Sequence, residues 1–408
     1  MISKMTSRER IMRTIEGKDR DHVPLYCWVF GFSPNPNLRW KRDAEEIKYW
    51  YTMRLEHIHT LPKPWGIEDD FKRVKAWLSL GIDDVLDVSV PWGMNPEVET
   101  KDWQETDVLC REYSTPAGKL VQKVRQTKEE IPPGWVIQPD RVKLIEDFNL
   151  PRSVKFTVSE TEDIPKLKYL LAEPGEEQRK EYSRRISLIK DFSSKEGVPV
   201  QGWSVFGMDG VIWLCGIERA ILSSIEEPEF FQKLVDAVFE FDLMRTKIMI
   251  EAGGVDMIVQ RGWYSSTDFW SPDLFRKYVI PNLKKMTDVV HNAGLKYGYV
   301  MTTGVMNFIG DLEEAGVDLL YYVDPEQDRV DLNKIKDKLE GNLAAAGGIN
   351  TSISLTKGSK EEIRQAVFHA IRTLGDKKFI LSPVDALFPD TPWENVETMI
   401  SAWKEAQA

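Results

Sequence analysis

Two histidines separated by a single residue offer acid–base or metal chemistry. His57 and His59 stand in the segment LEHIHTLPKPWGIEDDF. In an extended segment, side chains two residues apart face the same side, so both imidazoles can point at one ligand or one metal ion. Alternatively, the pair ends a helix over residues 41–58 and caps or solvates it. Because an imidazole exchanges a proton near neutral pH, we take His57 and His59 as catalytic candidates.

Polar side chains also follow the predicted strands, at the strand ends where parallel α/β folds carry their chemistry. Asp87 closes the stretch VLDVSVPW and is the third catalytic candidate; a helix or loop cap is the alternative. Arg261 follows VDMIVQ and is suited to a substrate carboxylate. Its alternative is a structural ion pair with Asp268 or another neighbour. A strand-end carboxylate is costly without a role. We therefore take the aspartates as substrate-binding candidates together with the two polar residues after VDMIV: Asp209, Gln260, Arg261, Asp324 and Asp385.

The stretch KYGYVMTTG, residues 296–304, predicts a strand that ends without a histidine, cysteine or carboxylate. Tyr299, Met301 and Thr303 alternate with period two, so they share one face of that strand. If this face points inward near the strand end, the three side chains contact a ligand. If this face lies deeper in the barrel, the three side chains belong to the core. We take all three as substrate-binding candidates.

Tryptophan is frequent in this chain, with 14 residues, and some of these side chains are available to bind a flat ligand. Four of them end or directly follow predicted strands and are candidates for holding an aromatic ring: Trp28, Trp92, Trp203 and Trp263. Core packing is the alternative for each. The three cysteines, Cys27, Cys110 and Cys215, are too scattered for a metal site and favour a reducing cytoplasm.

The elements that must position these residues alternate between strand and helix. Eight strands are predicted, over 23–30, 83–91, 198–206, 255–260, 296–303, 317–323, 342–348 and 378–382. Helices between them, including one over 211–224, favour a parallel sheet, and eight strands favour a closed (β/α)8 TIM barrel with an N-terminal helical extension. Residues from about 95 to 160 break this rhythm and predict a β-hairpin and cap insertion. We expect a single domain over residues 1–408.

Composition excludes several functions. The net charge of −11 over 408 residues argues against nucleic-acid binding, which needs a basic surface. No apolar run approaches the ~20 residues of a membrane span. The first residues form a charged amphipathic stretch without the apolar core of a signal peptide, so we expect a cytoplasmic protein.

Several stretches resemble the uroporphyrinogen decarboxylase superfamily. They include MTSRERIMRTIEGKDRDHVP near the start, FGMDGVIWLCGIERAILSSIEEPEFF and GGVDMIVQ in the middle, and LSPVDALFPDTPWENVETM near the end. The resemblance covers nearly the whole chain. It implies a (β/α)8 barrel with the active site at the carboxyl ends of the strands. Because the superfamily hosts more than one reaction, the activity must be argued from the site.

Two well-known activities of that superfamily match poorly. Uroporphyrinogen decarboxylases resemble one another in an Arg-rich motif after the first strand; here LYCWVFGFSPNPNLRW contains only Arg39, and their strand-end aspartate aligns one position away from Asp87. Zinc-dependent methylcobamide:coenzyme M methyltransferases carry His-x-Cys-Gly where this chain has Met301 and Thr303 before Gly304, and Cys where it has Asp385. We therefore expect no Cys-ligated zinc; any metal would use His57, His59 or carboxylates.

A third activity fits better. In length and in its aromatic N-terminal third, the chain is similar to the corrinoid-dependent O-demethylase methyltransferases of anaerobes, of vanillate and syringate type. That resemblance implies methyl transfer from a methoxylated aromatic to cobalt(I) of a corrinoid (cobalamin) on a separate partner protein. The barrel then needs no nucleophile of its own. This chain lacks the Asp-x-His-x-x-Gly cobalt-ligating motif, which agrees with a separate corrinoid protein.

The sequence leaves alternatives open. One is a decarboxylase of a small aromatic or heterocyclic acid, with Asp87 handling the proton and Arg261 holding a carboxylate. Another is a barrel that binds a tetrapyrrole or corrinoid without turnover. The identity of the methyl donor, the help of a metal and the formation of a homodimer are also undecided. If His57, His59 or Asp87 helps the oxygen to leave, its loss should harm poor leaving groups most.

Overall fold

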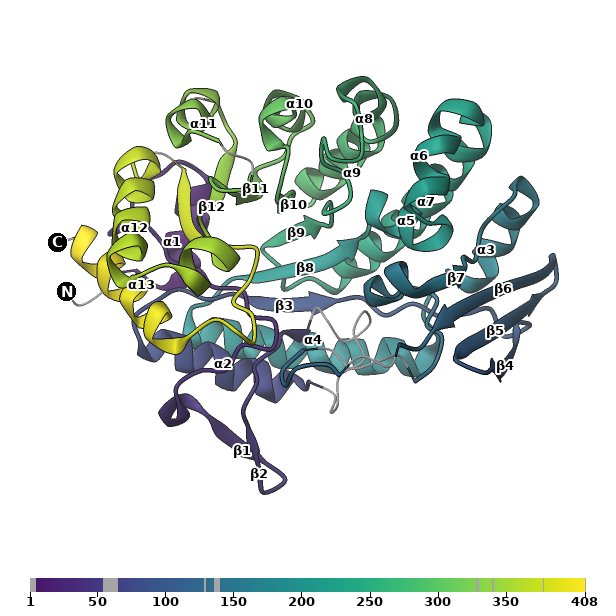
Figure 1. The fold of residues 1–408 in the computed structure, drawn as a ribbon, viewed down its shortest axis with the longest axis horizontal. Coiled ribbons are helices and arrows are strands. Elements are labelled where there is room, and N and C mark those ends of the chain that lie inside the picture. The colour runs from purple at the N-terminus through teal and green to yellow at the C-terminus, as the bar shows by residue number, and fades with distance from the viewer. Residues whose placement is uncertain are drawn as a thin grey trace.

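A curled sheet of parallel strands, flanked by helices, forms the centre of the molecule (Figure 1). The computed structural model describes residues 5–53, 65–127, 130–135, 140–327, 330–339, 341–376 and 378–407. Neighbouring strands follow the order β13-β12-β11-β10-β9-β8-β3. Their bounds are β3 Leu86–Ser89, β8 Val200–Val205, β9 Met257–Gln260, β10 Lys296–Val300, β11 Leu319–Val323, β12 Ala344–Asn350 and β13 Phe379–Val384. Nearly every residue in these strands is buried, as expected for a parallel sheet covered on both faces.

Residues 23–30, the closing segment, lie between the two edge strands and join them. Leu25 forms a parallel bridge with Leu381 of β13, and Tyr26 forms one with Asp83, just before β3. The backbone N–H of Asp83 donates to the carbonyl of Leu25 at 2.9 Å. The predicted first strand therefore takes the eighth position through single bridges, and on the side of β13 Pro24 has no N–H to continue the ladder. The result is the TIM-barrel-like fold predicted from the sequence.

The main helices pack around this sheet (Figure 1). Their bounds are α1 Ser7–Ile15, α2 Ile67–Ser79, α3 Ile164–Leu170, α4 Glu176–Glu196, α5 Met208–Cys215, α6 Ile217–Glu226, α7 Pro228–Ala252, α8 Pro272–Tyr278, α9 Ile280–Asn292, α10 Ile309–Glu314, α11 Leu332–Lys338, α12 Lys360–Leu374 and α13 Trp393–Ala406. Short turns of other helical types are Pro36–Leu38, Asp147–Arg152, Thr161–Asp163, Val305–Asn307 and Thr351–Leu355. No helix in the described ranges is long and apolar enough to cross a membrane.

Two predicted helices differ in the structure. The alternative that placed a helix over 41–58 is wrong for its first part, which forms the hairpin of β1 (Trp40–Arg42) and β2 (Glu45–Ile47). Asp43 and Ala44 both have positive φ there, at 51° and 67°, so they form a tight hairpin turn instead of a helix. The predicted helix over 211–224 is divided into α5 and α6 at Gly216, whose φ of 85° is not helical.

The insertion predicted at about 95–160 contains an antiparallel sheet of β4 (Glu99–Glu105), β5 (Val108–Thr115), β6 (Gly118–Arg125) and β7 (Ser153–Lys155). The predicted hairpin is confirmed, because Thr115 pairs with Gly118 across the turn between β5 and β6. β4 and β7 were not predicted. They extend the hairpin on both sides into a four-stranded sheet beside α3 (Figure 1).

Helix α1 is tied to the start of β3 by a buried ion pair. Thr6 and Glu9 form a capping box that begins this helix. Arg10 donates to the carboxylate of Asp83, and Ser7 Oγ donates to the same carboxylate at 2.6 Å. The side chains of Arg10 and Asp83 are only 4% and 1% exposed. Because Asp83 also bridges to Tyr26, this pair supports the closure of the barrel.

We expect Arg10→Ala to lower the free energy of unfolding by about 3–5 kcal/mol, because it leaves the Asp83 carboxylate buried without its cation. The control is Arg8→Ala on the same helix. Arg8 is 48% exposed and pairs with Asp256 at 2.5 Å, so its loss should cost less than about 1 kcal/mol. Urea unfolding of both variants measures the difference. Equal, small losses would contradict a supporting role for the buried pair.

Candidate active site

Three indole rings meet at the carboxyl ends of the strands. Trp28 lies on the closing segment, Trp203 on β8, and Trp263 just after β9. The ring centres of Trp203 and Trp263 are 6.3 Å apart and stacked, and those of Trp28 and Trp263 are 6.1 Å apart. We call these three residues the indole cluster. Because neighbouring parallel strands end at one edge, residues distant in sequence form one aromatic surface there.

A buried carboxylate orients one of these rings. Asp87 on β3 accepts hydrogen bonds from Gln201 Nε2 at 2.6 Å and from Trp203 Nε1 at 2.7 Å, both at Oδ1. Its Oδ2 accepts from the hydroxyl of Thr52. Asp87 and Trp203 face the same side because Asp87 pairs with Gln201 in the β3–β8 register. Both oxygens of Asp87 are thus engaged with protein donors, and one of these donors is a ring of the indole cluster.

A second carboxylate orients the next ring. Trp263 Nε1 donates to Asp385 Oδ2 at 3.0 Å. Asp385 comes directly after β13, whereas Trp263 comes directly after β9, so this hydrogen bond crosses the open end of the barrel. Two aspartates that the sequence singled out therefore act on two tryptophans that it also singled out.

Asp209 and Arg261 form a buried pair beside the cluster. Asp209 Oδ2 lies 3.7 Å from Arg261 Nε, and Oδ1 accepts the backbone N–H of Tyr264 at 3.0 Å. Arg261 stacks over Trp263 at 4.5 Å and over Trp213 at 5.0 Å from the ring centres. Burial raises the pKa of Asp209 to about 7, against the opposite influence of Arg261. The site therefore contains a carboxyl group that titrates near neutral pH.

One further carboxylate at this end was missed in the sequence. Asp147 Oδ1 accepts from Trp213 Nε1 and from the hydroxyl of Tyr264, both at 2.9 Å. Asp147 belongs to the irregular segment before β7, where neither helical nor strand periodicity indicates which way a side chain points. No sequence pattern singled out Trp213, because it lies among other apolar residues in helix α5. Only the tertiary contact identifies these residues as neighbours of Arg261.

A second group of aromatic rings surrounds Phe30, at the end of the closing segment. Phe30 stacks on Phe148 with ring centres 5.8 Å apart. Among the described residues, Trp28, Tyr51, Trp135 and Phe388 also have ring centres within 6.4 Å of it. Because Trp28 belongs to both groups, the aromatic surface continues from the indole cluster toward the insertion.

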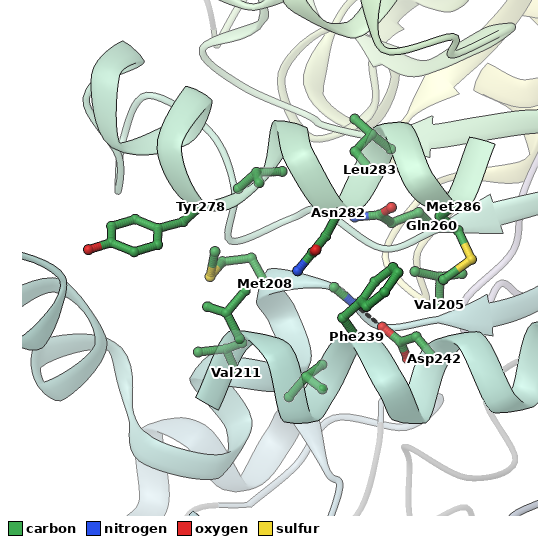
Figure 2. Close-up of a pocket in the computed structure, with 14 residues that line it drawn as sticks. Val205, Met208, Val211, Phe239, Asp242, Gln260, Tyr278, Asn282, Leu283 and Met286 are labelled. Carbon is green, nitrogen blue, oxygen red and sulfur yellow. Dashed lines mark hydrogen bonds between the residues drawn. The ribbon is translucent and has the colours of Figure 1, made fainter. Parts of the chain in front are cut away.

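Several candidates lie outside this cluster. Trp92 packs against Phe206 and Phe241 beneath Arg245. Gln260 accepts from the hydroxyl of Tyr297 at 2.6 Å and lines a pocket between the sheet and the helices (Figure 2). That cavity is about 40 Å³. It has room for a few water molecules but not for an aromatic ring.

The candidates on the strand over 296–303 and beyond it are also engaged within the protein. The hydroxyl of Tyr299 shares a hydrogen bond of 2.7 Å with Ser265 Oγ, and Met301 is fully buried. Thr303 contacts Ser266 and Asp268 through its hydroxyl. We interpret this face as packing, with Thr303 at its outer end.

Asp324 has a local structural role. Its Oδ1 accepts the backbone N–H groups of Glu326 and Gln327, and its Oδ2 accepts from Asn350 Nδ2 at 2.7 Å. These bonds cap the turn after β11 and join it to β12. The carboxylate is satisfied by these donors, which accounts for a buried aspartate at this strand end.

Residues 142–406, well over half of the chain, match the model of the family described as uroporphyrinogen decarboxylase (URO-D). The chain belongs to the URO-D family. The resemblance predicted from the sequence motifs is thereby confirmed at the level of the superfamily.

The relatives of this URO-D protein are named for different activities. It is 25% identical over 238 residues to a methylcobamide:CoM methyltransferase, MtaA, of Methanosarcina barkeri, over 57% of this chain and 66% of that one. It is 22% identical over 183 residues to a uroporphyrinogen decarboxylase of Prochlorococcus marinus, over 45% and 50% of the two chains. The alignments thus span two thirds or less of these curated relatives. A solved methyltransferase from Methanosarcina mazei shares the fold, with a TM-score of 0.58 over 99% of this chain and 100% of that chain, at 18% identity.

Across the part of the chain that the structure describes, no group of three or more His, Cys, Asp or Glu side chains is arranged to hold a metal ion. Cys27, Cys110 and Cys215 are each buried as free thiols. His57 and His59 lie outside the described residues, so their catalytic role stays a prediction.

The Asp209 carboxyl should make stability depend on pH. Its pKa is about 7 in the folded protein against an ordinary 3.8, so between pH 4 and 7 the folded state holds more protons than the unfolded chain. The free energy of unfolding then falls as the pH rises through this window. We expect Asp209→Asn to flatten that fall, as measured by urea unfolding at several pH values. The exposed Asp236→Asn should leave it unchanged, and parallel curves for all three proteins would contradict the assignment.

Proposed function

We propose that this protein is a methyltransferase that moves a methyl group from a methoxylated aromatic compound to cobalt(I) of a separate corrinoid protein. The observation that carries the proposal is the indole cluster, held by Asp87 and Asp385 at the carboxyl ends of the strands. The name of the Methanosarcina barkeri relative, a methylcobamide methyltransferase, supports a corrinoid as the methyl-carrying partner. The small aromatic substrate is inferred from the chemistry of the site.

Flat aromatic rings suit this surface. Stacked and edge-on contacts between rings contribute about 0.5–1.5 kcal/mol each beyond burial of area. The indole N–H groups of Trp203 and Trp263 are both bonded to carboxylates, so these rings keep a fixed orientation instead of turning toward the ligand. A preorganised aromatic surface can hold a methoxylated ring with its methyl group directed out of the barrel. Positioning of this kind can supply up to ~7–11 kcal/mol of the barrier.

In the transfer itself, the bond between the methyl carbon and the ether oxygen breaks, and both of its electrons stay on oxygen. The methyl group forms a new bond with the electron pair of cobalt(I). The departing oxygen becomes a phenolate, whose conjugate acid has a pKa of ~10, so a proton delivered during departure should help by roughly 10²–10⁴-fold. The protein therefore needs a proton donor rather than a nucleophile.

Asp209 is the described residue best suited to donate that proton. Its Oδ2 accepts no hydrogen bond from the described residues, and the group titrates at about 7. Asp87 is less suited, because Thr52, Gln201 and Trp203 already donate to both of its oxygens. We therefore assign Asp87 to orienting Trp203. His57 and His59 stay candidates for the same proton.

The function is tested by incubating the protein with methoxybenzenes and a reduced corrinoid protein. We expect the absorbance of methyl-cobalt to appear together with the free phenol. Parallel assays measure carbon dioxide from aromatic and heterocyclic acids, the products of an alternative decarboxylase. Release of carbon dioxide without methyl-cobalt would replace the proposal by decarboxylation. Binding of a corrinoid or tetrapyrrole without any product would indicate the alternative binding protein.

Comparing ethers with poor and good leaving groups distinguishes a residue that donates a proton from one that orients a ring. We expect Asp209→Asn to slow the demethylation of guaiacol-type ethers by at least ~10²-fold, and to slow an ether with a nitro-substituted ring much less, because that phenolate leaves without a proton. Asp87→Asn should slow both ethers equally, since it disturbs Trp203. His59→Ala is measured alongside. If only Asp87→Asn or His59→Ala distinguishes the two ethers, the proton comes from that residue instead.

A further inference from the structure

An arginine from the outer helix layer reaches the carboxyl ends of β3 and β8. Arg245 lies on α7 and is fully buried. Its guanidinium donates to the carbonyl oxygens of Ser204 at 2.8 Å, Val90 at 3.1 Å and Trp203 at 3.2 Å. Val90 directly follows β3. A single side chain thus joins the ends of two adjacent strands through their backbone oxygens.

Arg245 is unusual among buried arginines because its partners are neutral. No carboxylate of the described residues lies within ion-pair distance of it, and burial lowers its pKa to about 10. Its guanidinium stacks on Phe206 at 4.3 Å and on Trp92 at 5.2 Å from the ring centres. Burying a charge in this way is costly. In return, the hydrogen bonds of the guanidinium fix the geometry of the backbone at the active end of the barrel.

Asp242 holds the next residues of the same segment. One helical turn before Arg245, it accepts the backbone N–H of Phe206 at Oδ1, at 3.0 Å, and that of Gly207 at Oδ2, at 2.8 Å. Figure 2 shows Asp242 directed at this turn. We call Asp242 and Arg245 the α7 clamp. Its arginine binds carbonyl groups at the end of β8, and its aspartate binds the N–H groups that follow.

We propose that the α7 clamp positions the active site, by fixing the backbone of residues 203–207 so that Trp203 and Asp209 face the same space. Trp203 begins the clamped segment, and Asp209 lies two residues beyond it. Gly207 makes the sharp turn between them with φ of 56°, where an added Cβ would lie 2.5 Å from Gln260 Nε2. This inference rests on the proposed function only in taking Trp203 and Asp209 as parts of an active site.

Packing alone does not hold this turn. The cavity of about 40 Å³ in Figure 2 lies directly behind it and is lined by Gly207, Met208 and Asp242. Atoms that line a void lose dispersion contacts on that side. The hydrogen bonds of the clamp therefore take a larger share in holding the turn than they would in a filled core.

The chemistry of the clamp makes conservative variants informative. Lysine keeps the charge of Arg245 but has no planar fork, so it cannot bind three carbonyl groups in this arrangement. Asparagine keeps the shape of Asp242 but turns one acceptor into a donor, which faces a backbone N–H. Two exposed positions of the same helix give matched controls, Lys247→Gln and Asp236→Asn.

The first measurement does not depend on activity. The protein is labelled with 5-fluorotryptophan, and the ¹⁹F resonance of Trp203 is assigned by its absence in Trp203→Phe. At pH 8, above the pKa of about 7 that burial gives Asp242, we expect Arg245→Lys and Asp242→Asn each to shift the Trp203 resonance. The resonance of Trp103, on β4, should stay unchanged, and the control variants should shift neither. An unmoved Trp203 resonance in a folded clamp variant would overturn the proposal.

The second measurement is a double-mutant cycle on methyl transfer. We expect Arg245→Lys to lower kcat/KM by ~10²-fold, as for a misplacement of about 1 Å. If it acts through Trp203, combining it with Trp203→Phe should cost less than the product of the two single losses. Full multiplicativity would overturn the proposal. If the wild-type protein transfers no methyl group, the proposed function fails, and the Trp203 resonance alone still decides the role of the clamp.

Discussion

Buried carboxylates must find donors, and at the active end of this barrel that requirement organises the side chains around them. A buried polar group without a partner costs roughly 2–7 kcal/mol. Asp87 meets the requirement with the indole N–H of Trp203, and Asp242 meets it with two backbone N–H groups after β8. The half-buried Asp385 accepts from Trp263. Each bond that satisfies an aspartate thus also fixes a ring or a turn of the site.

The same pattern makes an aromatic site rigid without making it reactive. Indole rings whose N–H groups are bonded elsewhere present their apolar faces, and Arg261 lies over two such faces beside Asp209. A surface of this kind selects ligands by shape and orients them. It suits a reaction in which the nucleophile comes from a partner molecule and the barrel supplies position and a proton.

The insertion contributes to this end of the barrel as well as to the periphery. Asp147 and Phe148 belong to the segment that leads into β7, yet they contact Tyr264 after β9 and Phe30 on the closing segment. Residues from the cap and from the barrel therefore share one aromatic surface. The closing segment links them, because it carries both Trp28 and Phe30 between β13 and β3.

Much of the fold followed from the sequence by itself. The alternation of apolar runs with amphipathic segments predicted the barrel, since periodicity is set by which faces are buried. It also located Trp28, Trp203 and Trp263, because strand ends are legible as breaks in that periodicity. The same rule included Trp92 and Gln260, which end or follow strands too but pack against Phe206 and Tyr297. A strand end predicts position along the chain, not the direction of a side chain.

Only the tertiary structure decided which of these side chains meet. Asp87 contacts Trp203 and Asp385 contacts Trp263 across 116 and 122 residues of sequence, and no local pattern encodes such pairs. The α7 clamp was likewise invisible, because Asp242 and Arg245 sit in a helix whose sequence reads as an ordinary amphipathic surface. Hydrogen bonds between distant residues depend on the register of strands and the packing of helices, and these are set by the whole fold.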